Sequence, residues 1–300
     1  MELQQLRMFK AIADLGSIAK AAEKLHCVPS NITTRIKHLE DELGEPLLIR
    51  QGRGVILSPS GNLFLEYTNK ILMLTKESKR AIARDSTPAG KLSIGAIESS
   101  ATSRLPKLLS KYHQLHPRVD IEFSTSTWEN LEEAVAKHEL DSAIIAVKPV
   151  NPNIECIEIY HEELVLIASP SFEPITSPTS LIGRTIYMWP TGCPYRKALE
   201  NWLEKNSVSV PITSIASYGT ILGCVSAGAG VSLVPRGLYE QFKQIDGIKG
   251  YVFDQLHPVA NYFIWNKNTG YHSAKEAFLE LICTELTTLN VNTSAHNMTP

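Results

Sequence analysis

Residues 28–44 read VPSNITTRIKHLEDELG, and their apolar side chains recur at helical spacing. Intervals of four, three and four residues predict one narrow apolar helix face, which we expect to be buried. The four residues of this face are Ile32, Ile36, Leu39 and Leu43. The rest of the helix carries short hydrogen-bonding side chains and cations, with no acid before Glu40: Ser30, Asn31, Thr33, Thr34, Arg35, Lys37 and His38. This surface suits the base edges and phosphates of DNA, with an ordinary solvated face as the alternative.

Two shorter amphipathic segments precede this helix. Leu6, Phe9 and Ile12 share one face of the first segment, and Gly16 is placed to end it. Ser17 is an N-cap candidate for the second segment, whose small pair Ala21 and Ala22 permits close helix packing. Three short helices around one core, with the second braced against the third, predict a helix-turn-helix.

Residues 47–57, LLIRQGRGVIL, follow the third helix as two β-prone runs joined by a glycine-containing turn. This pattern predicts a β-hairpin, which would complete a winged helix-turn-helix. Arg50 and Arg53 lie in this wing, where a guanidinium reaches phosphate or the minor groove.

These features resemble the LysR-type transcriptional regulators. The resemblance runs from Leu3 to about Gly61 and rests on LRMFKAIADLGSIAKAAEKLH, LEDELGEPLLIR and LSPSG. Most members carry Gln-Pro-Ala-hydrophobic-Ser-Arg-Gln where this chain has PSNITTR at residues 29–35, so the resemblance does not carry over a base preference. VPSNITTRI and GCPYR are similar to a branch that includes putrescine-utilisation regulators.

The composition of the 300 residues is that of an ordinary globular protein, with 43% hydrophobic and 20% charged residues. A net charge of −2 means that DNA affinity must come from locally placed cations, doubled by dimerisation. No apolar run is long enough to span a bilayer and the N-terminus has no signal-peptide pattern, so we expect a cytoplasmic protein. The five cysteines have neither disulfide-framework nor zinc-site spacing, and we expect no metal and no cofactor.

A long helix is predicted after the wing, from the cap Ser58 and the first-turn Pro59 to about residue 84. Its apolar stripe has nearly heptad spacing and either packs on the chain's own core or forms an antiparallel dimer arm, which we favour. The proposed dimerisation residues are Phe64, Tyr67, Ile71 and Leu74.

From residue 91 the pattern alternates between strands and helices, which predicts two α/β lobes. The resemblance implies the fold of periplasmic binding proteins, with a ligand held between the lobes at the carboxyl ends of strands. We therefore expect a DNA-binding domain at 1–61, a linker helix and hinge at 62–90, an effector-binding domain at 91–290 and a flexible tail at 291–300. Within the effector domain, lobe I would hold residues 91–161 and 266–290, and lobe II residues 162–265.

Polar side chains at the starts of predicted helices are the candidates for effector binding. Hydroxyls there also cap helices, so this reading remains open for each. Cys193 lies before Pro194 at the positive end of a helix, where a lowered thiol pKa would permit redox sensing, and Arg196 could bind a carboxylate. The candidates are Glu98, Ser99, Ser100, Thr102, Ser126, Thr127, Trp128, Thr191, Cys193, Tyr195, Arg196, Tyr218 and Thr220.

The sequence thus predicts a ligand-responsive transcriptional regulator that senses a small polar, carboxylate-bearing metabolite. The resemblance implies promoter DNA, the effector and further copies of the chain as partners, in a homodimer or homotetramer, with RNA polymerase as one more partner to consider. An enzyme using Cys193 and His161 is disfavoured because no orienting third residue accompanies them, so we assign no catalytic residue. A constitutive architectural DNA-binding protein would not need two lobes.

Overall fold

A computed structural model describes residues 1–52, 54–82, 87–244 and 247–295. The chain divides into two compact units. Unit 1 is Met1–Ser86 with the segments Lys137–Glu139 and Thr269–His272, and unit 2 is Thr87–Ala136, Leu140–Asn268 and Ser273–Pro300. We describe each unit by itself.

Unit 1 begins with a bundle of three short helices: α1 (Leu3–Leu15), α2 (Ile18–Lys24) and α3 (Pro29–Leu43). Gly16 ends α1 in the left-handed conformation at φ 60°, and the Ser17 side chain accepts from Lys20 N at the start of α2. The core includes Ile32, Ile36 and Leu39 as expected. The prediction for Leu43 was wrong, because this residue at the last position of α3 is 39% exposed.

The wing and the long helix complete unit 1. Strands β1 (Leu48–Gln51) and β2 (Gly54–Leu57) pair antiparallel, and α4 spans Pro59–Ile82. Ser58 caps α4, since its Oγ accepts from Gly61 N at 2.9 Å and donates to Pro46 O at 2.5 Å. Gly61 is required here because a Cβ would lie 2.1 Å from Leu47 O. The wing and α4 are therefore joined by a close backbone crossing.

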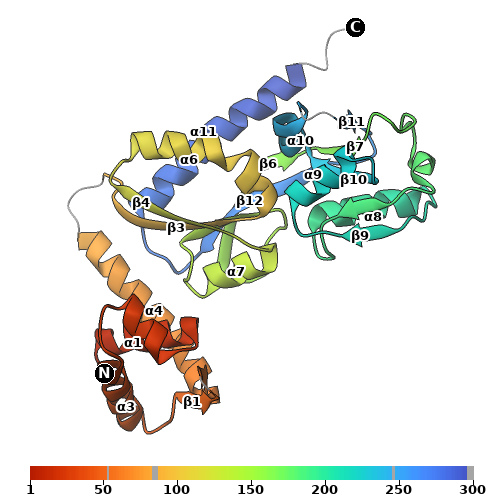
Figure 1. Cartoon of the computed structure of the whole chain (residues 1–300). Coiled ribbons are helices and arrows are strands. Elements are labelled where there is room, and N and C mark those ends of the chain that lie inside the picture. The colour runs from red at the N-terminus through yellow and green to blue at the C-terminus, as the bar shows by residue number, and fades with distance from the viewer. Residues whose placement is uncertain (53, 83–86, 245–246, 296–300) are drawn as a thin grey trace. The chain divides into compact units, whose positions relative to one another are not determined.

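Lobe I of unit 2 is a five-stranded sheet in the order β4-β3-β5-β12-β6. β3 is parallel to β4 and β5, whereas β12 is antiparallel to β5 and β6. Helices α6 and α11 cover one face and α7 covers the other (Figure 1). The elements are β3 (Gly90–Ala96), α5 (Glu98–Ser103), α6 (Leu105–Leu115), β4 (Val119–Thr125), α7 (Trp128–Ala136), β5 (Ser142–Ile145), β6 (Ile154–Glu162), β12 (Val259–Asn266) and α11 (Ser273–Ala295).

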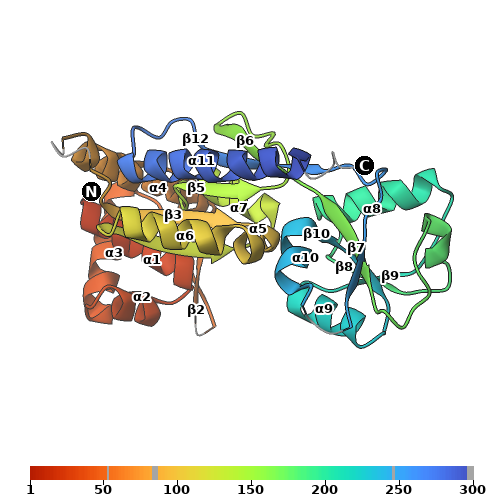
Figure 2. The same ribbon diagram turned by 90° about the horizontal axis from the view of Figure 1, so that it is seen from above.

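Lobe II is a second five-stranded sheet in the order β11-β7-β10-β8-β9. Helix α8 lies on one side of this sheet and α9 and α10 on the other (Figure 2). The elements are β7 (Leu164–Ala168), the 3-10 helix η1 (Pro178–Leu181), β8 (Ile186–Met188), α8 (Pro194–Lys205), β9 (Ile212–Ser214), α9 (Tyr218–Ser226), β10 (Val231–Pro235), α10 (Arg236–Phe242) and β11 (Lys249–Tyr251). The predicted two-lobed α/β architecture is confirmed.

The lobe boundary differs from the sequence expectation. Glu162, the last residue of β6, and residues 259–265 of β12 belong to the sheet of lobe I, so they were wrongly placed in lobe II. The strand β6 was not predicted, because its sequence IECIEIYHE does not alternate strictly between apolar and polar residues. The single helix expected at 101–115 is two helices, α5 and α6, separated at Arg104. The last helix extends to Ala295, beyond the expected start of the tail, and residues 296–300 of that tail lie outside the described residues.

Candidate functional site

The outward face of α3 presents the expected polar residues. Ser30, Asn31, Thr33, Thr34 and Lys37 are exposed. The hydroxyl of Thr33 already has a partner within the helix, since its Oγ1 donates to Pro29 O at 3.0 Å. Ser30, Thr34 and Lys37 therefore form the most available part of this face, a hydroxyl pair followed by a cation.

Arg35 is held by other groups of unit 1. Its NH1 donates to Glu2 Oε2 at 2.6 Å and its Nε donates to Asn31 Oδ1 at 3.2 Å. Its backbone oxygen accepts from the side chain of Gln5. These contacts fix α3 against the start of α1, so Arg35 also acts as a positioning residue for the outward face.

The wing has one of its two arginines among the described residues. Arg50 is exposed on β1, at a position compatible with a phosphate contact. Arg53 lies outside the described residues.

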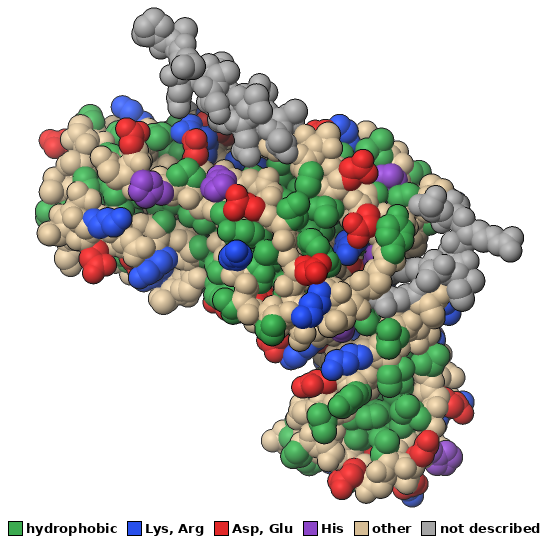
Figure 3. All heavy atoms as spheres, turned by 180° about the vertical axis from the view of Figure 1, so that it is seen from behind, with side chains coloured by type: hydrophobic (Ala, Val, Ile, Leu, Met, Phe, Trp, Pro, Cys, Tyr) green, Lys and Arg blue, Asp and Glu red, His purple; other side chains and the backbone are tan. Residues whose placement is uncertain are grey.

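The apolar face of α4 is only partly as predicted. Leu63, Tyr67 and Leu74 are 58%, 55% and 55% exposed. Phe64 was wrongly included in this face, because its ring packs on Phe9 of the same unit with centroids 5.3 Å apart. Ile71 is half-buried. The space-filling view shows a patch of exposed hydrophobic side chains on unit 1 (Figure 3). The sequence reading overlooked Leu63, although it lies one helical turn before Tyr67.

In unit 2 the first turn of α5 contributes buried hydroxyl groups, one of which forms a hydrogen bond to lobe II. Ser99 and Ser100 are buried, at 4% and 1% exposure. Ser99 Oγ donates to Tyr195 Oη of lobe II at 3.4 Å, and Ser100 Oγ lies 2.7 Å from Tyr160 Oη. The expectation that both hydroxyls face a ligand is thus not met, since each already has a protein partner.

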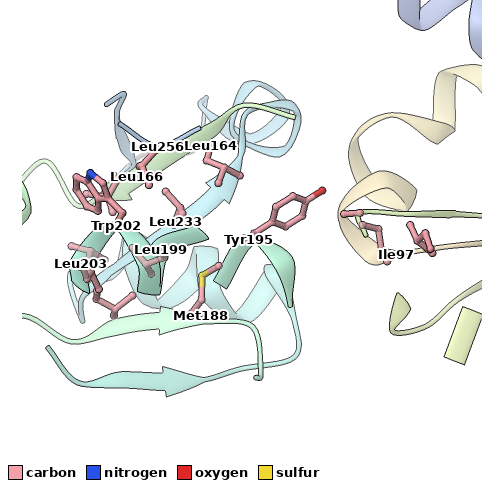
Figure 4. Close-up of a cluster of buried hydrophobic side chains, with 14 of the residues drawn as sticks. Ile97, Leu164, Leu166, Met188, Tyr195, Leu199, Trp202, Leu203, Leu233 and Leu256 are labelled. Carbon is pink, nitrogen blue, oxygen red and sulfur yellow. The ribbon is translucent and has the colours of Figure 1, made fainter. Parts of the chain in front are cut away.

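Tyr195 of lobe II makes one of the contacts with lobe I. Its ring projects from α8 toward the end of β3 near Ile97 (Figure 4). Its hydroxyl donates to Oδ1 of the fully buried Asn261 at 3.3 Å. Burial raises the pKa of Tyr195 well above its usual range, so the hydroxyl remains protonated and can donate. Asn261 was missed by the sequence reading, because nothing local marks a buried amide in a strand.

A second interlobe contact is made by Glu162 of β6, which also forms an ion pair within lobe I. Arg104 donates to both oxygens of Glu162, from Nε at 3.0 Å and from NH2 at 2.9 Å. Glu162 Oε1 also accepts from Gly237 N at the start of α10, at 2.9 Å. Gly237 is needed there, since a Cβ would lie 2.9 Å from Arg104 Nε. The carboxylate, 2% exposed as a residue, ties α5–α6 of lobe I to α10 of lobe II.

A third contact joins the start of α7 to the loop before α8. Trp128 Nε1 donates to Gly192 O at 3.0 Å. Thr127 Oγ1 accepts from Asn130 N and so caps the start of α7, whereas Ser126 Oγ accepts from the side-chain amide of Asn130. Thr191 is exposed. Among these candidates only Trp128 has an interlobe hydrogen bond in the described structure.

Arg196 does not present a free cation to a ligand. Its Nε donates to Glu200 Oε1 at 2.8 Å, and its NH1 donates to Trp189 O at 3.1 Å and to Ser214 Oγ at 2.8 Å. Its side chain is 12% exposed. The expectation of a carboxylate clamp is therefore corrected, because lobe II itself uses most of the donors of this guanidinium.

The thiol of Cys193 is not activated by its position before α8. Burial raises its pKa, and this effect outweighs the lowering by the amides of Tyr195 and Arg196 and by the charge of Arg196. The expectation of a lowered thiol pKa was wrong, since desolvation dominates over the helix terminus.

The remaining effector candidates are described by their local contacts and burial. Tyr218, 4% exposed, packs on Trp189 with ring centroids 5.3 Å apart, and its hydroxyl has no hydrogen-bond partner among the described residues. Thr220 contributes to the cap of α9, as its backbone N and Oγ1 both donate to Ser217 Oγ. Glu98 and Thr102 are half-buried. Trp189 was not among the candidates predicted from the sequence. Its buried Nε1 has no hydrogen-bond partner in the described part of the chain.

Comparisons with known proteins agree with this architecture. Residues 3–62 match the family model for bacterial regulatory helix-turn-helix proteins of the lysR family, and residues 85–286 match the LysR substrate-binding domain. The chain is 37% identical to the HTH-type transcriptional regulator YusT of Bacillus subtilis, covering 93% of this chain and 95% of the relative. It is 34% identical to the HTH-type regulator GltR of the same species, covering 93% and 95%.

Solved structures show the same fold. A full-length OxyR variant from Pseudomonas aeruginosa superposes with a TM-score of 0.77 at 21% identity, covering 94% of both chains. CbnR, a LysR family regulator, superposes with a TM-score of 0.70 at 23% identity, covering 95% of this chain and 99% of that one. Within the described residues no helix is long and apolar enough to cross a membrane. The matches to both family models, over nearly the whole chain, establish that it belongs to the LysR family of DNA-binding transcriptional regulators with an effector-binding domain.

Proposed function

We propose that this regulator reads DNA through the outward face of α3 and the wing, and is controlled by a small polar metabolite bound between the lobes of unit 2. The observation that carries the second part is the contact of Ser99, Tyr195 and Asn261, since it couples the two lobes through one buried polar chain. A ligand that enters beside this chain changes the relative free energies of lobe arrangements.

The proposed DNA-contacting residues keep their sequence assignment. Ser30, Thr34 and Lys37 are assigned to base edges and adjacent phosphates, and Arg50 to a phosphate of the wing side. Asn31, Thr33 and Arg35 support this face through their contacts within unit 1. Arg53 remains in the proposal on its place in the sequence alone.

The assembly is proposed to be a dimer through α4, or a tetramer of two such dimers. The exposed side chains Leu63, Tyr67 and Leu74 support this, because a monomer would leave them in water. Two linked heads would also compensate for the net charge of −2 by binding two half-sites together. A protein that binds promoter DNA would work in the cytoplasm, where RNA polymerase would be a further partner at the promoter.

The closer branch and the domain limits are also part of the proposal. VPSNITTRI and GCPYR favour the branch similar to putrescine-utilisation regulators. The working division is a DNA-binding part to residue 61, a linker to residue 90 and an effector part from residue 91, with Glu162 and residues 259–265 moved to lobe I. No catalytic step is assigned to any residue.

The test is electrophoretic retardation of promoter fragments by the full chain, with and without small polar metabolites. We expect a ligand that raises the melting temperature to change the mobility or the footprint of the complex. Tyr195→Phe removes the hydroxyl that joins the lobes and should weaken this response while leaving ligand-free DNA binding intact. Arg118→Gln, an exposed change in unit 2, is the control. A chain that retards no fragment contradicts the proposed function.

A further inference from the structure

Val28 is an exposed apolar residue at the start of α3, two positions before the first residue assigned to DNA. Its exposure is 61%, and the following Pro29 and Ser30 are exposed as well. Single exposed apolar side chains are common on protein surfaces and need no explanation by themselves. Val28 differs from them because it occupies a position that strongly favours another kind of side chain.

This position is the N-cap of α3, where a side-chain oxygen normally accepts from a backbone N–H of the first helical turn. Serine, threonine, aspartate and asparagine are preferred at an N-cap, and valine is among the poorest residues there. No side chain caps α3 at Val28, whereas Ser17 accepts from Lys20 N at the start of α2. Valine at residue 28 therefore makes α3 less stable than serine would.

Packing in the core does not compensate for the missing cap. At many helix starts, the residue before the N-cap makes an apolar contact with the fourth residue of the helix. In α3 these two residues are Cys27 and Ile32, and both belong to the core of unit 1, Cys27 as a partly buried neighbour. Val28 is not among the side chains of this core within the described residues. Its side chain thus contributes neither to the cap nor to the core.

The turn between α2 and α3 fixes the position of Val28. His26 adopts the left-handed conformation at φ 51°, and Cys27 N donates to Ala22 O at 2.9 Å. Val28 O accepts from Asn31 N at 3.1 Å, which anchors its backbone to the first turn of α3. The side chain is stiff because it branches at Cβ. Two methyl groups are therefore held at the tip of α3 and lose little conformational entropy on binding.

The N-terminal end of a recognition helix is the part that contacts base edges in helix-turn-helix proteins. The apolar group that a base pair presents in the major groove is the 5-methyl group of thymine. We propose that Val28 contacts the 5-methyl group of one thymine in each half-site and so contributes to the sequence preference of the protein. This inference rests on the proposed function, because it requires α3 to enter the major groove.

The test compares thymine with uracil, which forms the same base pair and lacks the 5-methyl group. The DNA is the operator that the full chain enriches from genomic fragments, with each thymine of the protected half-sites replaced in turn by deoxyuridine. We expect replacement at one position to raise the Kd by about 4-fold for each half-site, which corresponds to one buried methyl group. Replacement of thymines outside the protected half-sites should leave the Kd unchanged.

Val28→Ser shows whether this residue makes the contact. The variant should bind the thymine operator more weakly and should no longer distinguish thymine from uracil at the sensitive position. Its melting temperature should stay the same or rise, because serine is the better cap and no core packing is lost. Val150→Ser is the matched control, since Val150 is an 86% exposed valine in unit 2. This control should keep both the Kd and the discrimination between thymine and uracil.

The results separate this inference from the proposed function. An operator that is bound equally well with uracil at every position overturns the role of Val28 alone. Equal discrimination by Val28→Ser and the unsubstituted chain also overturns it, as does a lower melting temperature of Val28→Ser, which would show that Val28 supports the fold. A chain that enriches no operator contradicts the proposed function and this inference with it.

Discussion

Among the residues proposed to contact DNA, Thr34 is exposed and its side chain has no hydrogen bond in the described structure. We predict that Thr34→Ala lowers the preference of the protein for its operator over random DNA by about 1–3 kcal/mol. The measurement is fluorescence anisotropy on the two duplexes at one salt concentration. An equal loss of affinity on both duplexes would contradict a base contact.

Arg50→Ala is the matched variant for a phosphate contact. It should weaken binding to both duplexes by a similar factor and reduce the slope of log K against log salt by about 1. A selective loss on the operator would instead place Arg50 on a base edge.

Cys193 carries a prediction about pH. Because burial raises its pKa, the thiol is neutral at pH 7 and forms less thiolate than an ordinary cysteine until the pH exceeds that raised value. Alkylation by iodoacetamide, quantified at Cys193 by mass spectrometry, should therefore be slower between pH 7 and pH 8 in the native chain than in the same chain in denaturant. Faster alkylation in the native chain would contradict the raised pKa and would support the alternative of redox sensing through Cys193.

Single residues show where sequence reasoning was sufficient. Ser30, Thr34 and Lys37 could be placed outward because helical spacing alone decides which side they occupy. Arg196 could not be placed, because its partner Ser214 lies 18 residues away on another element. Phe64 was misplaced for a similar reason, as its position within the stripe did not reveal the ring of Phe9.

At the scale of elements, α4 has an exposed apolar stripe that a second copy would cover. We predict that Leu74→Glu dissociates the assembly toward monomers, since a charge would have to be buried in the seam, and that operator affinity falls with it. Analytical ultracentrifugation across a concentration series measures the first effect, and anisotropy the second.

Lys76→Glu is the control for this change. Lys76 is exposed and lies two residues beyond Leu74, on the other side of the helix. It should leave sedimentation unaltered. If Leu74→Glu also leaves sedimentation unaltered, α4 does not form the dimer seam.

Elements with strong internal signals were predictable, and those defined by distant partners were not. The helices α1 to α4 follow from periodicity, glycine ends and the caps Ser17 and Ser58. The strand β6 was missed because its pairing with β12 joins segments about a hundred residues apart. The place of β12 in lobe I likewise depends on that pairing.

At the scale of the whole effector unit, Glu162 holds both lobes through Arg104 and Gly237. We predict that Glu162→Ala lowers the free energy of unfolding by about 2–4 kcal/mol, since it leaves Arg104 without its carboxylate; the partial exposure of Arg104 limits the loss. Thermal denaturation of the full chain, followed by circular dichroism, measures the change.

The exposed ion pair of Lys111 and Glu285 provides the comparison. Lys111→Ala should cost less than about 1 kcal/mol, because both groups keep their hydration. Equal effects of the two variants would show that the Glu162 contact is no stronger than a surface pair.

The two-lobed plan was predictable because two runs of alternating strands and helices follow one another in the chain. The contacts that close the lobes on each other were not. The interlobe hydrogen bonds of Tyr195, Asn261 and Glu162 join residues that lie far apart in the sequence. No local spacing of residues predicts such contacts.

The proposed function requires the chain to recognise particular promoter sequences through paired winged heads. The most direct measurement is selection of genomic fragments by the full chain, followed by footprinting of the enriched fragments. We predict a small set of enriched fragments, each protected at two half-sites spaced by about one helical turn or a multiple of it. Uniform recovery of fragments, or protection of a single isolated half-site, would contradict the account.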